Sequence, residues 1–120
     1  MLSMRFVIED ISETIIPKVY LLKARSEDGK VLIAFEIPLR LQDMLNFKQG
    51  DKLSMEIDKK ELEDVKDDDL YMTGWVFAKT ERKLMVSIGG LRFSIEGQIG
   101  ELLDKFNLMD KVYVRIRKIQ

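Results

Sequence analysis

The chain of 120 residues contains no cysteine and no histidine. Without cysteine there are no disulfide bonds, no thiol nucleophile and no thiolate-bound zinc, and without histidine the commonest general base is missing. An enzyme with this sequence would have to work with carboxylates, lysines, tyrosines and hydroxyl groups alone. The usual catalytic groups are therefore absent.

The chain also lacks an excess of charge of one sign. Its net charge is −1, although 34% of its residues are charged. A dedicated nucleic-acid binder usually carries a net basic balance, because neutralising phosphates drives its affinity. The N-terminus has no signal-peptide pattern, and no apolar run approaches membrane-spanning length. We therefore expect an intracellular, cytoplasmic, soluble protein without membrane contact.

What the sequence does have is apolar residues at alternate positions, which predicts strands. Hydrophobic residues make up 46% of the chain, enough for the core of a single domain over residues 1–120. Strands are expected at 18–25, 31–37, 52–57, 70–78, 84–95 and 111–119. Turn residues join the first two of these in one hairpin, and the polar turn 79–83 joins 70–78 to 84–95 in a second.

Two short segments with helical spacing, 39–47 and 98–106, mark an internal repeat. Each ends at a phenylalanine and precedes an Asp-Lys turn and a strand. The aligned positions are Phe47, Asp51, Lys52, Leu53, Met55 and Ile57 with Phe106, Asp110, Lys111, Val112, Val114 and Ile116. Strand alternation can produce such a match by coincidence. If the repeat is real, two halves pack as a pseudo-symmetric antiparallel β-barrel, which removes exposed sheet edges.

An acidic stretch, 58–69, lies between the halves, with Leu62 and Val65 as its only apolar residues. Charge runs of this kind usually form solvated loops or a marginal surface helix. Clustered carboxylates also suit a hard cation, but the glycine-punctuated spacing of a calcium loop is missing. We therefore expect a solvated loop and no metal.

The last strand carries Tyr113, Arg115 and Arg117 on the face opposite its apolar residues. Barrels of the oligonucleotide-binding type use such faces to stack bases and follow phosphates, and Trp75 would extend the surface. The alternative is an ordinary polar solvent face, with Trp75 filling the barrel. We favour this alternative because acidic residues are as numerous as basic ones.

Glycines interrupt two of the expected strands, at Gly74 and at Gly89-Gly90. A glycine inside a strand often marks a bulge, a bend or a close backbone approach. Neither the strand–GxGxxG–helix pattern nor a P-loop lysine accompanies them. Gly89-Gly90 is therefore expected at a barrel corner or a docking edge, and no cofactor or small-molecule substrate is expected.

These glycines belong to an ordered set of features in the second half of the chain. Tyr71 and Gly74 are followed by Ser87, Gly89, Gly90 and Leu91, then by a closing Gly97 and a lysine-rich strand, 111–119. In this pattern the chain resembles the eighth subunit of RNA polymerase, and residues 6–11 resemble the opening strand of that family. Eukaryotic members have a longer acidic insertion than 58–69, so the chain is more similar to the archaeal form, known as the G subunit.

The resemblance implies an antiparallel β-barrel of the oligonucleotide-binding type and a non-catalytic, peripheral subunit of DNA-directed RNA polymerase. It implies docking on the largest subunit, support of assembly or stability, and only weak or indirect contact with nucleic acid. The alternative is a free-standing barrel that binds single-stranded nucleic acid through Tyr113, Arg115 and Arg117 with Trp75.

We expect docking at Gly74, Trp75, Ser87, Gly89, Gly90 and Leu91. Glycine permits close backbone approach, so a partner strand is expected to add to an open barrel edge near 87–91. Outward apolar side chains would anchor the contact. The candidate anchors are Leu22, Leu32, Tyr71 and Met85.

Overall fold

The chain folds as a closed barrel of eight antiparallel strands with two short helices. The computed structural model describes residues 2–119. The strands are β1 (Leu2–Glu13), β2 (Val19–Ser26), β3 (Val31–Pro38), β4 (Lys52–Asp58), β5 (Leu70–Lys79), β6 (Lys83–Ile88), β7 (Leu91–Gly97) and β8 (Lys111–Ile119), and the helices are α1 (Leu39–Leu45) and α2 (Gly100–Lys105). The predicted all-β antiparallel barrel is confirmed, and it is consistent with the oligonucleotide-binding type.

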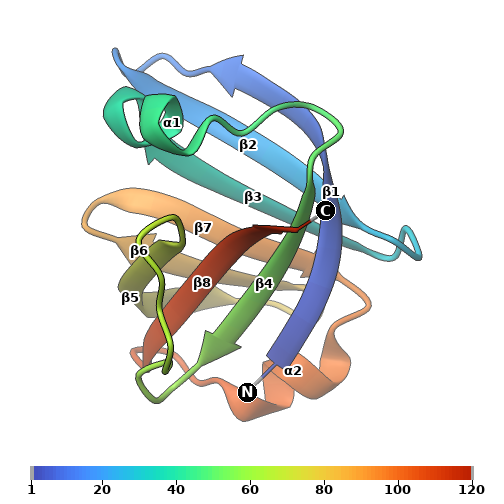
Figure 1. Cartoon of the computed structure of the whole chain (residues 1–120). Coiled ribbons are helices and arrows are strands. Elements are labelled where there is room, and N and C mark those ends of the chain that lie inside the picture. Colours follow the sequence, from blue (N-terminus) through green and yellow to red (C-terminus); the bar gives the residue numbers. More distant parts are fainter. Residues whose placement is uncertain (1, 120) are drawn as a thin grey trace.

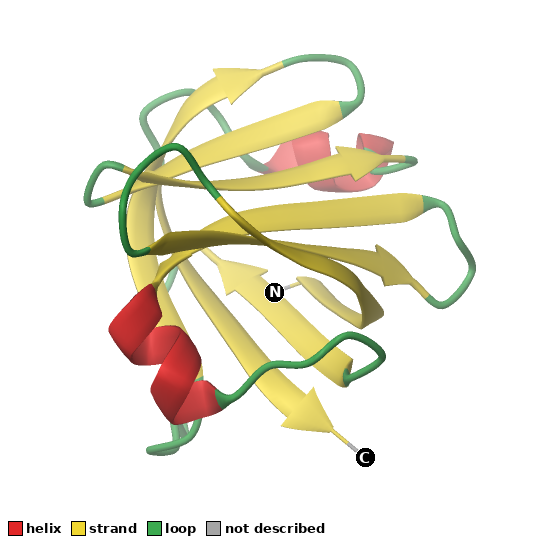
Figure 2. Ribbon diagram, turned by 90° about the horizontal axis from the view of Figure 1, so that it is seen from above, coloured by secondary structure: helices red, strands yellow, loops and turns green. Residues whose placement is uncertain are grey.

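The order of strands around the barrel is β1-β2-β3-β7-β6-β5-β8-β4, and β4 pairs with β1 to close the ring. The helices lie at opposite ends of the barrel (Figures 1 and 2). Among residues 2–119, no helix has the length and apolar character that crossing a membrane requires.

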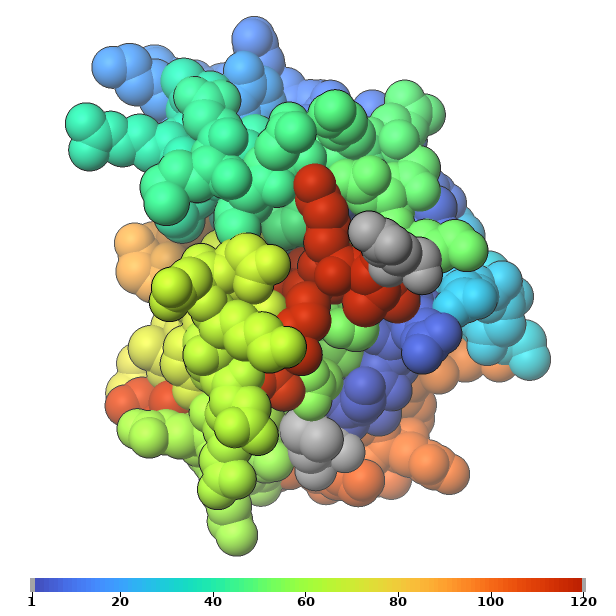
Figure 3. Space-filling view, in the orientation of Figure 1, coloured from blue at the N-terminus to red at the C-terminus, as the bar shows by residue number. Residues whose placement is uncertain are grey.

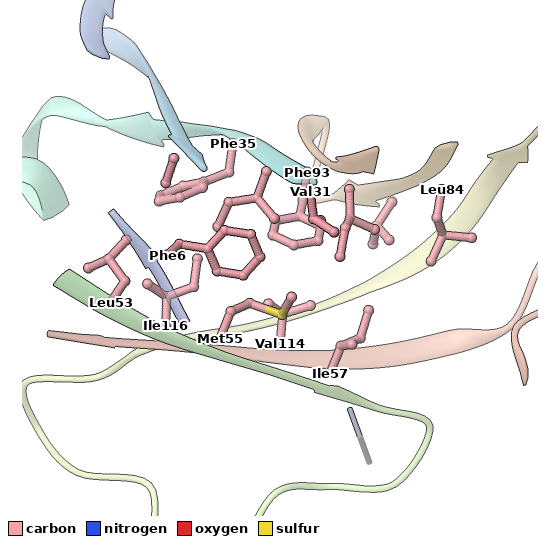
Figure 4. Packing of buried hydrophobic residues seen from close by; sticks show 14 of the residues in the cluster. Phe6, Val31, Phe35, Leu53, Met55, Ile57, Leu84, Phe93, Val114 and Ile116 are labelled. Carbon is pink, nitrogen blue, oxygen red and sulfur yellow. The ribbon is translucent and has the colours of Figure 1, made fainter. Parts of the chain in front are cut away.

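Alternation within the strands directs the core side chains into the barrel. Val31, Ile33, Phe35 and Ile37 of β3 are all buried, as predicted from their spacing. Apolar side chains from all eight strands form one continuous cluster, part of which is shown in Figure 4. Burying each large side chain contributes about 1.5–3 kcal/mol, so this single cluster is the main source of stability.

The predicted repeat is confirmed by matching turns in the two halves. The Asp51 carboxylate accepts a hydrogen bond from the Lys48 N–H at 2.8 Å. At the equivalent place, the Asp110 carboxylate accepts one from the Asn107 N–H at the same distance. Each turn leads from a helix into a strand that lines the core.

Strand pairing follows the same pseudo-two-fold symmetry. Phe35 pairs with its own equivalent, Phe93, in the contact between β3 and β7. On another side of the barrel, Glu56 of β4 pairs with its equivalent, Arg115 of β8. The two halves therefore meet along two seams, the β3–β7 pair and the β4–β8 pair, and the pseudo-two-fold axis passes through both.

The expected single stretch 84–95 is two strands, β6 and β7, joined by a tight turn at Gly89-Gly90. Both glycines have a positive φ, 58° and 92°, which side-chain-bearing residues seldom adopt. Ser87 in β6 is paired on both sides, with Trp75 of β5 and Arg92 of β7. The expected open edge at 87–91 is therefore wrong, because the described strands close the ring there.

Candidate functional site

The outer face of β5 carries a row of exposed aromatic side chains: Tyr71, Trp75 and Phe77. The side chain of Trp75 is 51% exposed. Gly74 and Val76, on either side of it, are buried, as the alternation of a strand requires. The expectation that Trp75 fills the barrel is therefore wrong.

Strand β8 widens this row. The ring of Tyr113 stacks on that of Tyr71, with 6.2 Å between centroids and 15° between planes. Lys111 pairs with Trp75 across the strands, and its ammonium lies 6.0 Å from the Trp75 ring and 5.6 Å from the Tyr113 ring. We call Tyr71, Trp75, Phe77 and Tyr113 the aromatic strip.

The loop between α2 and β8 extends the apolar surface beside the aromatic strip. Leu108 and Met109 are both exposed in this loop. The Met109 N–H donates a hydrogen bond of 2.7 Å to the Val76 carbonyl, which fixes the loop against β5. Exposed apolar groups that gather on one surface are typical of interaction sites.

The internal symmetry shows that the barrel does not require aromatic residues here. In β1, the positions equivalent to Tyr71, Trp75 and Phe77 are Ser3, Val7 and Glu9. Phe77 and Glu9 even occupy the β-bulge of their respective strands. Glu9 forms an ion pair with Arg25 of the neighbouring strand. The same backbone therefore accepts Ser3, Val7 and Glu9 in one half, so closure of the barrel does not by itself require the exposed Trp75 and Phe77 in the other.

The arginines of the alternative nucleic-acid face form hydrogen bonds with other groups of the chain. Arg115, only 7% exposed, donates two hydrogen bonds to one Glu56 oxygen, at 2.6 and 2.9 Å, and a third to the Glu63 carbonyl at 2.6 Å. Arg117 donates two hydrogen bonds to the Asp69 carboxylate, both at 2.6 Å. These carboxylates neutralise the two guanidinium groups and compete with any phosphate.

The crossover segment, residues 59–69, is a mostly exposed loop, as predicted, and the marginal surface helix that its charge run also allowed is not formed. The sequence did not predict its anchoring: the segment lies over β8 in Figure 3. The Leu62 N–H donates to the Tyr71 hydroxyl at 3.2 Å, and the Asp69 side chain is fully buried. Hydrogen bonding from Arg117 holds the pKa of Asp69 below its usual value. Within residues 2–119, no group of three or more acidic side chains is placed to hold a metal ion.

Gly74 has a structural role inside the barrel. A Cβ atom at this position would lie 2.3 Å from the Ser87 carbonyl oxygen and 2.9 Å from side-chain atoms of Val86 and Ile88. The absence of a side chain therefore lets β6 lie close against β5.

The other expected docking residues are distributed over the outer surface. Trp75 lies in the aromatic strip, with Ser87 paired beside it. Gly89 and Gly90 form the turn at the end of β6, and Leu91 is half-buried after them. Docking at these positions stays a prediction.

The expected anchors differ in their placement. Tyr71 is exposed and belongs to the aromatic strip, whereas Leu32 and Met85 are half-buried. Leu22 is fully buried, so its assignment as an outward anchor is wrong. The contribution of Lys111 was missed, because its place beside Trp75 follows from the pairing of β5 with β8.

Comparison with known proteins identifies a family. The family model for the G subunit of DNA-directed RNA polymerase matches residues 1–119. No curated protein matches the chain. Among solved structures, the cytoplasmic molybdate-binding protein ModG, crystallised with molybdate bound, aligns with 97% of this chain and 89% of its own, at 11% identity and a TM-score of 0.37. That structural likeness is too weak to bear on fold or ligand.

Proposed function

Because the chain belongs to the G-subunit family of DNA-directed RNA polymerase, we propose that it docks on the largest polymerase subunit through the aromatic strip. Members of this family are non-catalytic subunits, so the chain is a polymerase subunit and not itself an enzyme. We also propose that the chain lies at the periphery of the polymerase, that it supports assembly or stability of the complex, and that it is located in the cytoplasm. The archaeal form is also part of the proposal, because the crossover segment is short.

The contrast between the outer faces of β5 and β1 carries this proposal. Equivalent backbone positions are occupied by Trp75 and Phe77 in one half and by Val7 and Glu9 in the other. Aromatic residues are enriched in the buried centres of protein interfaces, where a few of them dominate the binding energy. The closed ring of strands favours a contact made by side chains on a sheet face over the addition of a partner strand.

The double variant Trp75→Val/Phe77→Glu tests the proposal, because it places on β5 the residues that β1 carries at the same sites. We expect it to fold like the wild type and to bind the largest subunit at least a hundredfold more weakly, since interface aromatics contribute about 2 kcal/mol or more each. The measurement is a pull-down of the tagged chain from archaeal extract, washed at high salt, with mass spectrometry of the retained proteins.

Glu9→Gln is the matched control, because it changes the equivalent of Phe77 on the polar half. It should recover the large polymerase subunits in the same proportion as the wild type. Equal recovery by the double variant would show that the aromatic strip is not the docking surface. Recovery of nucleic acid alone, lost in salt, would instead favour the single-stranded nucleic-acid binder.

A further inference from the structure

Strand β8 carries four cationic side chains, and three of them are neutralised within the chain. These three pairs are Arg115–Glu56 at 2.6 Å, Arg117–Asp69 at 2.6 Å and Lys118–Asp51 at 3.4 Å. The fourth, Lys111, has no carboxylate partner among residues 2–119 and is exposed. It lies at the centre of the aromatic strip, so its charge will be covered by whatever binds there.

The surroundings of Lys111 define what a partner has to supply. Its ammonium is held over the faces of Trp75 and Tyr113, which attract a cation but do not replace the hydrogen bonds made to water. A partner that covers Trp75 removes that water. An ammonium buried without an acceptor is costly, and a carboxylate gives the strongest charge-assisted hydrogen bond.

We infer that the aromatic strip binds a protein segment in which an aspartate or glutamate stands beside apolar side chains. The carboxylate pairs with Lys111, while the apolar groups cover Trp75 and Phe77. This inference rests on the proposed docking and specifies the chemistry of the partner segment. A nucleic-acid strand fits less well, because Arg115 and Arg117 are occupied, and Lys111, the one cation of β8 without a carboxylate partner in the described residues, cannot by itself follow successive phosphates.

The repeat offers a matched control for Lys111. Its equivalent is Lys52, which is exposed at the same turn and pairs with Val7 where Lys111 pairs with Trp75. The two lysines therefore have the same charge and the same backbone, but only Lys111 lies over aromatic rings. A general effect of net charge would appear equally in variants of either residue.

The test measures the dissociation constant of the purified chain and the largest subunit at several salt concentrations. Lys111→Gln should weaken binding ten- to hundredfold at low salt, on the order expected for one desolvated charge pair, and should flatten the salt dependence. Lys52→Gln should bind like the wild type, and Lys111→Arg should retain most of the affinity. Thermal unfolding of each variant verifies that the barrel is intact.

Zero-length carbodiimide coupling gives a second readout, since it forms an amide only between an amine and a carboxylate in contact. The wild type should yield a cross-link from Lys111 to an acidic residue of the largest subunit. Lys111→Arg should bind without forming that cross-link.

The outcomes separate the inference from the docking proposal. If Lys111→Gln keeps wild-type affinity and salt dependence while Trp75→Val weakens binding, docking stands and the carboxylate partner is wrong. Equal weakening by Lys52→Gln, or competition by an oligonucleotide without any cross-link, would also overturn the inference. If Trp75→Val has no effect, or if the wild type does not bind, both proposals fail.

Discussion

Gly74 occupies the place that Phe6 fills in the other half of the barrel. Phe6 is fully buried, and each of the two residues pairs with an equivalent core position, Leu53 or Val112. Because Gly74 has no side chain, β6 lies close against β5 at this site. The two halves thus share a backbone pattern but fill the core differently.

Gly74→Ala should therefore lower the free energy of unfolding by about 1–3 kcal/mol, the usual cost of overpacking. The added methyl group would lie 2.3 Å from the Ser87 carbonyl oxygen, a backbone atom that cannot move without disturbing the strand pairing. Urea unfolding measures the effect. Gly100→Ala is the control, because nothing lies within 4 Å of its Cβ position, and it should be neutral or slightly stabilising. An unchanged midpoint for Gly74→Ala would contradict the argument.

At the scale of the element, one buried carboxylate, that of Asp69, attaches the crossover segment to β8. Asp69 accepts hydrogen bonds from Arg117 and from the Lys66 N–H, and both lower its pKa. A carboxyl group whose pKa is lowered by folding contributes stability above its unfolded pKa of about 3.9 and loses it as the pH falls through the folded value. The segment should therefore loosen in acid.

Asp69→Asn should cost about 1–3 kcal/mol at pH 7, because it leaves the partly buried Arg117 without its carboxylate. The difference between wild type and variant should be constant above about pH 5 and shrink below about pH 4. Urea unfolding from pH 7 to pH 2 measures it, with the exposed neighbour Asp68→Asn as control. A difference that stays constant into strong acid would count against this role of Asp69.

The alternation of apolar and polar residues predicted the buried side of those strands in which one face is clearly more apolar than the other. This holds for β3 and β8, although Leu32 and Ile119 lie on the opposite face, and the predicted apolar faces are buried. In β5 both faces carry apolar residues, with Leu70 and Val76 inside and Tyr71 and Trp75 outside. Alternation cannot choose between these faces, and pairing with the distant β8 decides it.

The candidate site was predictable only in part for the same reason. Trp75 and Tyr113 were singled out for their residue type, yet their meeting over Lys111 depends on the pairing of β5 with β8. The occupation of Arg117 by Asp69 joins residues 48 positions apart. Long-range pairs of this kind leave no local signal in the sequence.

For the whole molecule, the features that both halves share are those that build the barrel, and the features that differ between the halves lie on the outer surface. Both halves supply the same strands, helix and turn, and their bulges coincide. Their outer faces differ, with an ion pair of Glu9 and Arg25 on one and the aromatic strip on the other. A duplicated pattern that builds one barrel can thus present two different surfaces to a complex.

The seams between the halves also predict that neither half folds alone. β3 pairs with β7 and β4 with β8, so each isolated half would expose two unpaired edges and the apolar face of its sheet. The Phe35 and Phe93 rings, 6.4 Å apart, belong to different halves but to one core. The expected single domain over residues 1–120 therefore has a direct test.

Dividing the chain after Asp64, within the exposed crossover, leaves every strand intact. Each fragment expressed by itself should lack a cooperative unfolding transition, whereas the two expressed together should co-purify as one barrel. Circular dichroism and thermal unfolding distinguish these states. A cooperative transition in either fragment alone would mean that the halves are separate domains. The docking surface would then belong to the C-terminal fragment, because all four residues of the aromatic strip lie within it.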